Sequence, residues 1–202
     1  MSSNSILSFL TQRASVPAAA LTEPAPSEFA LEQAFTAAMT APDHKALRPW
    51  RFIIIAHQQR ESLGQLIVEA SLAMDESLSD EKKAKLTQKP MRAPLIVAVV
   101  LHYQAHPKVP KSEQLMTTGI AAYNFMLALQ AQQYGSVWLS GHYTHHPVLH
   151  HGLGLSVHEE LQGFIYCGTS SIALETLQKG RASMRPDIKQ HVREWQTASN
   201  KG

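Results

Sequence analysis

The chain has 202 residues, of which 44% are hydrophobic, a formal net charge of +2 and one cysteine. This length and composition favour a single globular domain over residues 1–202 and exclude an intrachain disulfide, while the mild charge and the scattered lysines and arginines argue against nucleic-acid binding. No apolar stretch approaches the roughly 20 residues needed to span a bilayer, and a lone cysteine suits a reducing compartment, so a cytoplasmic protein with no membrane partner is expected.

The first predicted elements are two helices joined by an irregular connection. A short helix is expected over residues 4–13, followed by a Pro/Ala-rich connection over residues 14–25. The second helix is expected over residues 26–40, with Ser27 as its N-cap. Pro42 ends this helix, because a proline disfavours α geometry in the residue before it.

The middle of the chain predicts strands that alternate with helices. The β-branched run at residues 51–56 predicts a strand, and residues 58–74 predict an amphipathic helix. The charged segment over residues 75–89 leaves two interpretations open, a solvated helix or a mobile insertion. Residues 94–103 form a continuous apolar run, which is typical of a central strand covered on both faces.

The strongest helical pattern lies over residues 112–134, where apolar side chains extend around most of the circumference. Gly135 is expected to end this helix as a left-handed C′ residue. A short strand over residues 136–140, a short histidine-rich helix over residues 145–153 and a strand over residues 161–167 follow. An exposed helix this apolar usually marks an interface, so we expect a homodimer.

The order of these elements, with helices and strands alternating, predicts an α/β or α+β fold. After the last strand, the sequence is rich in proline and arginine. It is expected to form an extension that ends in a short helix near Trp195.

Several catalytic motifs are absent from the sequence. It contains no GxGxxG, no GxxxxGK[ST], no HExxH, no CxxC and no GxSxG. These absences argue against a P-loop nucleotide site, a zinc protease and a hydrolase with a nucleophile elbow.

Three places in the sequence are suited to an anionic ligand. Residues 13–15 (RAS) offer a guanidinium fork, a hydroxyl and backbone N–H groups at the end of the first helix. Residues 41–50 (APDHKALRPW) carry three basic side chains on a loop stiffened by prolines. Residues 138–141 (WLSG) lead from a strand into a turn, where α/β sheets often bind ligands. The plainer alternatives are a solvated helix end, a surface loop anchored by Trp50, and a buried strand with a glycine turn.

Taken together and in this order, these segments resemble the nitroreductase family, in particular its short, minimal YdjA-like subgroup. A small-residue helix and a strand ended by Gly-Thr complete the resemblance. It covers nearly the whole chain, and residues 41–52 (APDHKALRPWRF) are its most specific part. The resemblance implies a mixed sheet wrapped by helices, an extensive homodimer interface and two FMN sites at that interface.

The resemblance also implies roles for individual residues. The segment that grips the FMN phosphate and ribityl chain is matched by Arg13, Ala14 and Ser15. The segment that lies along the flavin ring is matched by Trp138, Leu139 and Ser140. His44 matches a loop position that reaches the flavin from the partner subunit. Thr40 stands where the family often has a basic residue, and Pro17 stands where many members have a lysine, so positive charge near the cofactor is reduced.

The implied activity is the reduction of a small oxidant, such as a nitroaromatic or a quinone, by NAD(P)H through FMN in a ping-pong cycle. The alternative is a flavin-binding module that stores or senses FMN without efficient turnover. No metal is expected, because no carboxylate or cysteine completes a ligand set around the histidines between His142 and His158, although a metal-binding protein remains a third interpretation. Cys167 is expected to be a core residue.

Overall fold

The computed structural model of the chain describes residues 3–182 and 184–195. It divides into two compact units, one over residues 15–173 and the other containing the described residues of 1–14 and 174–202. The single domain expected from the sequence remains a prediction.

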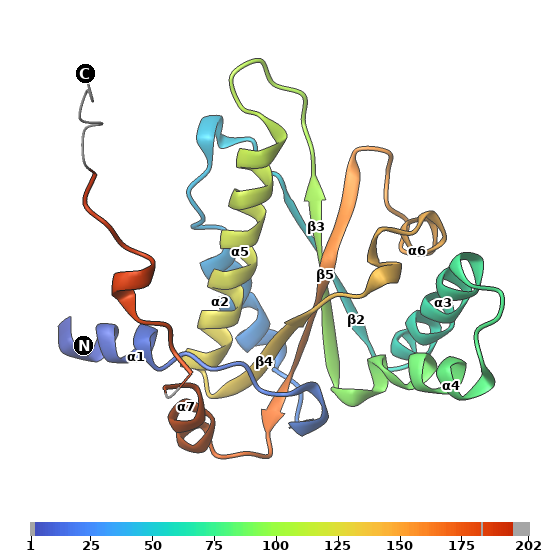
Figure 1. Ribbon diagram of the computed structural model, residues 1–202, viewed down its shortest axis with the longest axis horizontal. Coiled ribbons are helices and arrows are strands. Elements are labelled where there is room, and N and C mark those ends of the chain that lie inside the picture. The colour runs from blue at the N-terminus through green and yellow to red at the C-terminus, as the bar shows by residue number, and fades with distance from the viewer. Residues whose placement is uncertain (1–2, 183, 196–202) are drawn as a thin grey trace, which may run out of the picture. The chain divides into compact units, whose positions relative to one another are not determined.

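A five-stranded sheet forms the centre of the unit over residues 15–173 (Figure 1). The strands are β1 (Leu21–Thr22), β2 (Trp50–Ala56), β3 (Leu95–His102), β4 (Tyr134–Leu139) and β5 (Glu159–Ser170). β5 pairs with β4 along one of its edges and with β3 and β1 along the other, and β2 lies beside β3. All of these pairings are antiparallel. The expected architecture of a sheet wrapped by helices is confirmed.

β3 is the central strand, as its unbroken apolar sequence predicts. All seven residues from Leu95 to Leu101 are buried. Helices α2 (Glu28–Ala38) and α5 (Lys111–Ala131) cover one face of the sheet, and helices α3 (Gln59–Met74) and α6 (Pro147–Gly152) cover the other (Figure 1). Burial on both faces requires apolar side chains at successive positions, which is the reason that β3 lacks alternation.

Several predicted helix boundaries are confirmed in detail. Ser27 caps α2, since its side-chain oxygen accepts a hydrogen bond from the backbone N–H of Ala30 at 3.2 Å. The charged segment for which two interpretations were open contains a helix, α4 (Asp80–Gln88), which packs against α3. Ala34 and Ala38 of α2 are fully buried, so their small side chains let α2 approach α5 closely.

The predicted role of Gly135 is wrong. Helix α5 ends at Ala131, the left-handed residue after it is Gln133 with φ 68°, and Gly135 lies within β4. A Cβ atom on Gly135 would lie 2.7 Å from Cγ2 of Val16 and 2.8 Å from Cδ2 of Leu21. Gly135 therefore permits close packing against the segment that precedes β1, a requirement that local helix patterns do not reveal.

Other differences concern short elements. β1 lies in the segment expected to be an irregular connection, and β5 extends beyond the predicted strand at both ends. The predicted histidine-rich helix is present as α6, and a 3-10 turn that was not predicted, η4 (His142–His145), precedes it. None of the helices in the described ranges is long and apolar enough to cross a membrane.

The second unit contains α1 (Ser3–Thr11), α7 (Leu174–Ala182) and the 3-10 turn η5 (Ile188–Gln190). The first of these helices was expected and α7 was not. The short helix expected to end near Trp195 is wrong, because residues 192–195 have no regular structure.

Gly64→Ala tests the packing of α4 on α3. At an exposed helix position this change stabilises a protein by about 0.5–1 kcal/mol. Here the new methyl group would press against the backbone oxygen of Thr87 in α4, so we expect a net loss of about 1–3 kcal/mol in the free energy of unfolding. Urea unfolding measures the difference. Gly180→Ala in α7, where nothing lies within 4 Å of the added carbon, is the control, and a gain at Gly64 would contradict the packing.

Candidate functional site

The segment Trp138-Leu139-Ser140 lies where β4 leaves the sheet. Leu139 makes the last ladder pair of β4, with Phe164 of β5, and Ser140 is the first residue beyond the ladder. Trp138 is half-buried against the core, whereas Leu139 is 40% exposed and Ser140 is also exposed. This strand end therefore presents a large side chain and backbone groups at the surface.

Ser15 lies beside the same strand. Its neighbour Val16 donates a backbone hydrogen bond of 3.0 Å to the carbonyl oxygen of Ser136 in β4. Ser140 follows four residues later, which at strand spacing corresponds to roughly 13 Å. An elongated ligand could therefore contact both serines along β4. Arg13 and Ala14 directly follow α1 in the other unit, where the Arg13 N–H bonds to the Leu10 carbonyl at 3.4 Å.

The loop over residues 41–50 has an unusual backbone. Lys45, Ala46 and Arg48 adopt left-handed conformations, with φ of 66°, 51° and 50°. Such a conformation costs a non-glycine residue roughly 1–2 kcal/mol. Strain of this kind persists only where surrounding contacts hold it, and it concentrates at functional sites.

The contacts that hold this loop come from the first turns of α5. The hydroxyl of Thr117 donates to the Pro42 carbonyl at 3.0 Å, and the hydroxyl of Thr118 donates to the Pro49 carbonyl at 3.1 Å. Both threonines are buried, and Thr118 is only 1% exposed. The two ends of the loop are thus fixed to one helix.

A pair of glutamines fixes the middle of the loop. Gln114 of α5 is buried, accepts a hydrogen bond from the Gln104 N–H at 3.0 Å and donates one to the Gln104 carbonyl at 2.8 Å. The side chain of Gln104 in turn donates to the Leu47 carbonyl. We call the residues Gln104, Gln114, Thr117 and Thr118 the loop clamp.

The sequence analysis did not identify the loop clamp. The sequence does contain an indication of it, because the polar residues at 114, 117 and 118 share one face of an otherwise apolar helix. Their partners could not be identified, since the loop and the helix are about 70 residues apart in the chain.

His44 and Thr40 are both anchored on α5. Nδ1 of His44 lies 2.9 Å from Oε2 of Glu113, and both side chains are about half exposed. The hydroxyl of Thr40 donates to the Ala37 carbonyl at 2.7 Å and accepts a longer bond, 3.4 Å, from the Asn124 amide. An exposed contact of this kind adds little stability, so its main effect is to orient the imidazole ring.

The predicted site residues of this unit form two groups. Ser15 and residues 138–140 flank β4. Thr40 and His44 lie in and beside the loop that precedes β2, and their side chains contact Asn124 and Glu113 of α5. The tertiary structure therefore brings Ser15 together with the segment 138–140, and it places Thr40 and His44 elsewhere.

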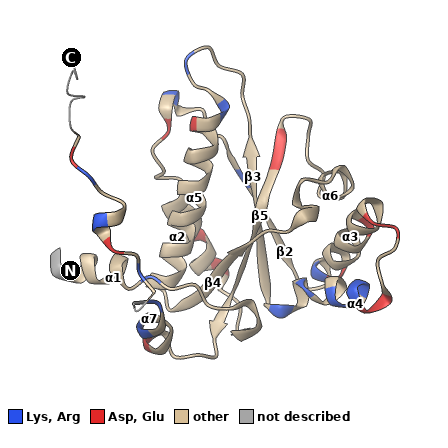
Figure 2. Ribbon diagram, viewed as in Figure 1, with Lys and Arg blue, Asp and Glu red and all other residues tan. Residues whose placement is uncertain are grey.

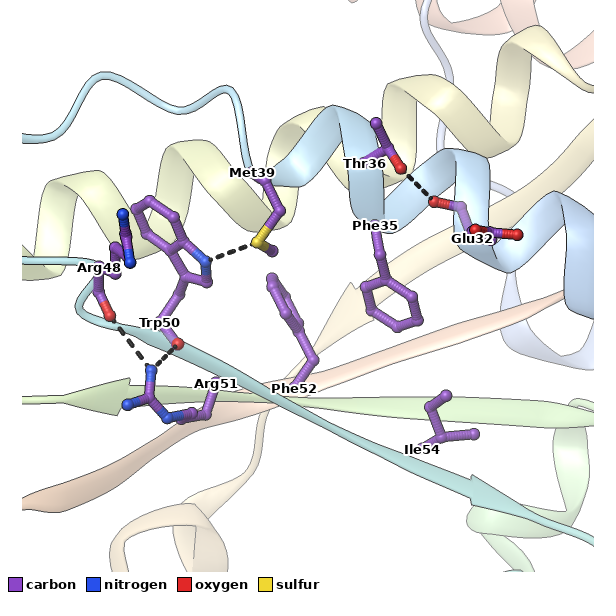
Figure 3. Close-up of a pocket in the computed structure, with 9 residues that line it drawn as sticks. All are labelled: Glu32, Phe35, Thr36, Met39, Arg48, Trp50, Arg51, Phe52 and Ile54. Carbon is purple, nitrogen blue, oxygen red and sulfur yellow. Dashed lines mark hydrogen bonds between the residues drawn. The ribbon is translucent and has the colours of Figure 1, made fainter. Parts of the chain in front are cut away.

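An apolar groove lies beside the loop, between α2 and β2 (Figure 3). Its volume is about 610 Å³, and its apolar lining consists of Phe35, Met39, Trp50, Phe52 and Ile54. The indole N–H of Trp50 donates to the sulfur of Met39 at 3.2 Å. Among the described residues β2 pairs only with β3, so the groove follows an open edge of the sheet.

The outer face of α5 is also apolar. It carries a set of exposed side chains that we call the α5 stripe: Leu115, Met116, Ile120 and Tyr123. Met116 is 61% exposed, and open space surrounds Gly119 within the stripe. Figure 2 shows that α5 bears charge only in its first turn. A contiguous apolar face of this kind is typical of an interface.

The histidines after β4 have local structural roles. His146 caps α6, since its Nδ1 accepts a bond from the Val148 N–H at 3.3 Å, and Nε2 of His150 donates to the Thr144 carbonyl at 3.0 Å. Across the described ranges, no three His, Cys, Asp or Glu side chains are arranged to hold a metal ion. Cys167 is fully buried, and burial raises the pKa of its thiol, so its expected place in the core is confirmed.

Thr118→Val tests the loop clamp. The change removes the Thr118 donor to the Pro49 carbonyl, which still accepts a hydrogen bond from the His102 N–H at 2.7 Å, so we expect a cost of about 0.5–1.5 kcal/mol. We expect lower unfolding free energy and faster proteolysis within residues 42–49. Thr87→Val is the matched control, because the Thr87 hydroxyl donates to Lys83 within its own helix. Equal effects of the two substitutions would mean that the loop does not depend on this bond.

Comparison with known proteins agrees with this architecture. The model of the nitroreductase family matches residues 10–169. The provisionally named NAD(P)H nitroreductase YdjA of Escherichia coli K12 is 36% identical over 160 residues, which cover 79% of this chain and 86% of that protein.

Solved structures show the same fold. A nitroreductase-like family protein from Bacillus cereus superposes with a TM-score of 0.75 at 20% identity, covering 96% of this chain and 98% of that one. The FMN-dependent nitroreductase NfnB from Mycobacterium smegmatis, solved in complex with NADPH, superposes with a TM-score of 0.70 at 16% identity, covering 96% and 99% of the two chains. The match of the family model over most of the chain and the identity to YdjA together show that this protein belongs to the nitroreductase family.

Proposed function

We propose that this protein is a homodimeric, FMN-dependent oxidoreductase that uses NAD(P)H to reduce a small oxidant such as a nitroaromatic or a quinone. One observation carries the proposal beyond family membership. The residues that the family resemblance assigns to FMN form two groups, one along β4 and one held on α5 beside exposed apolar side chains, which fits a site shared between two subunits.

The α5 stripe supports the dimer. A second copy related by a two-fold axis would cover it with the same surface, and we expect such an interface to bury well above roughly 2,000 Å². The loop clamp attaches residues 41–50 to the same helix that carries the stripe. A dimer formed through α5 therefore carries Thr40 and His44 into the interface, where they can reach the β4 segment of the partner.

The FMN assignments follow from this arrangement. In the proposed site, the phosphate and the ribityl chain are held by Arg13, Ala14 and Ser15. The flavin ring is contacted by Trp138, Leu139 and Ser140. The partner subunit contributes Thr40 and His44. The exposure of Leu139 and Ser140 beyond the ladder, together with the position of Ser15 along the same strand, fits an elongated cofactor with a planar ring at one end.

The protein's own part in the chemistry is positioning. FMN would supply the two-electron transfer that side chains lack. The Ser140 backbone N–H serves as a donor to the flavin N5 position, and because it is fixed before the reaction it needs no reorganisation. The nicotinamide and the oxidant would occupy the same place in turn, which gives ping-pong kinetics. No side chain needs to act as an acid or base.

We place this activity in the cytoplasm, where NAD(P)H is available and where a lone thiol such as Cys167 stays reduced. The alternative function is a flavin-binding module that stores or senses FMN. It is favoured by the two positions that lack positive charge, Thr40 and Pro17.

Anaerobic titration of the purified protein separates these functions. We expect a yellow protein whose flavin absorbance is bleached by NADPH or NADH and restored by a nitroaromatic or a quinone. Bound FMN that neither nicotinamide bleaches would support the storage or sensor module instead. Protein that binds no FMN would refute both.

Mixed dimers test the shared site. His44→Ala and Arg13→Glu homodimers should each bind FMN poorly. If the site is shared, one site of a mixed dimer carries both substitutions and the other carries neither, so about one sound site per heterodimer is restored. FMN content of heterodimers purified with two different tags measures this recovery. Sedimentation of each variant checks that it remains dimeric, and FMN content no higher than in the homodimers would place both residues in the same chain's site.

A further inference from the structure

The end of β4 lies over an irregularity in β5. Val99 of β3 pairs with Gly163, but the next residue, Val100, pairs with Leu161, so Gln162 is an extra residue in β5. This is a β-bulge, which bends a strand and increases its local twist. Gly163 directly precedes Phe164, the last ladder partner of β4, so the bulge lies where β4 departs from the sheet.

Gly163 leaves no room for a side chain. Its φ is +127°, a backbone conformation that favours glycine. A Cβ atom at this position would lie 2.7 Å from the carbonyl oxygen of Leu139 and 2.7 Å from Nε1 of Trp138. The Trp138 indole and the Leu139 carbonyl therefore rest directly on the backbone of Gly163.

This contact determines the direction of the next N–H group. The peptide between Leu139 and Ser140 is planar, and in a trans peptide the C=O and N–H bonds point in opposite directions. Because the Leu139 oxygen faces Gly163 on β5, the Ser140 N–H points away from β5. It is thus directed out of the sheet, toward the space beside β4.

We propose that Gly163 is a positioning residue for the FMN ring: by lacking a side chain beneath Trp138 and Leu139, it fixes the Ser140 N–H in the direction of the flavin. The inference rests on the proposed function. The inference adds Gly163, a residue of β5, to the proposed site. It also gives the β-bulge a role, which is to orient the Ser140 N–H as a hydrogen-bond donor.

Gly163→Ala is the direct test, and Gly154→Ala is its matched control. Gly154 also has a positive φ, +69°, but nothing lies within 4 Å of an added Cβ, so alanine there tests a positive-φ position without the contact. We expect Gly163→Ala to raise the Kd for FMN at least tenfold and to change the visible circular dichroism of bound flavin. Gly154→Ala should leave both at the wild-type values. If Gly163→Ala and the wild type have the same Kd for FMN and the same circular dichroism of bound flavin, the inference is overturned.

A double-mutant cycle with Trp138→Leu tests the route of the effect. If Gly163 acts through the indole, the double variant should bind FMN about as weakly as Trp138→Leu alone. If the increases in the Kd for FMN caused by the two substitutions multiply in the double variant, Gly163 does not act through the indole.

Nuclear magnetic resonance of the wild-type apoprotein covers the case in which Gly163→Ala does not fold. On addition of FMN, the Ser140 amide signal should shift, while the Gly154 amide should not. A Ser140 signal that stays unchanged as FMN binds would overturn the inference and the role of Ser140 as a donor, while FMN binding and FMN-dependent activity would still stand. If the wild-type protein binds no FMN, the proposed function itself fails.

Discussion

The burial of β3 on both faces is the constraint on which the rest of the structure depends. Seven successive side chains of this strand are withdrawn from water, so helices must cover both sides of the sheet. With β3 and β5 in the interior, β2 and β4 become the outer strands. One group of proposed site residues flanks β4, whereas the other is held against α5 by contacts with Asn124 and Glu113.

Helix α5 connects the core, the proposed interface and the site. Phe125 and Leu129 on its inner face pack into the core beside β3. Three residues of the loop clamp, Gln114, Thr117 and Thr118, lie in its first turns, and the exposed α5 stripe occupies its outer face. The low amphipathicity that the sequence shows for this helix thus has two causes: one apolar face is buried within the protomer, and the other is available to a second copy. The strained loop depends on the same helix, since its carbonyl groups are paired with buried side chains of α5.

The proposed chemistry relies on backbone groups more than on side-chain acids or bases. The donor assigned to the flavin is a peptide N–H, and its direction depends on the register of β4 against the bulge in β5. Strand pairing defines such a direction more rigidly than side-chain rotamers do. This explains why the sequence lacks a triad or a metal motif although the family consists of oxidoreductases, since the cofactor supplies the reactive group.

The sequence by itself determined the elements that have strong local patterns: the buried strand at β3, the helices α2, α3 and α5, the cap at Ser27 and the segments that resemble the nitroreductase family. It could not determine β1, whose two residues form a strand by pairing with the distant β5. Nor could it predict the role of Gly135, where Val16 and Leu21 pack so closely that a side chain would not fit. Nor could it place His44, whose contact with Glu113 joins segments that are 69 residues apart in the chain. The reason is the same in each case: local periodicity reports which side of a segment is buried, whereas tertiary structure decides which distant segment buries it.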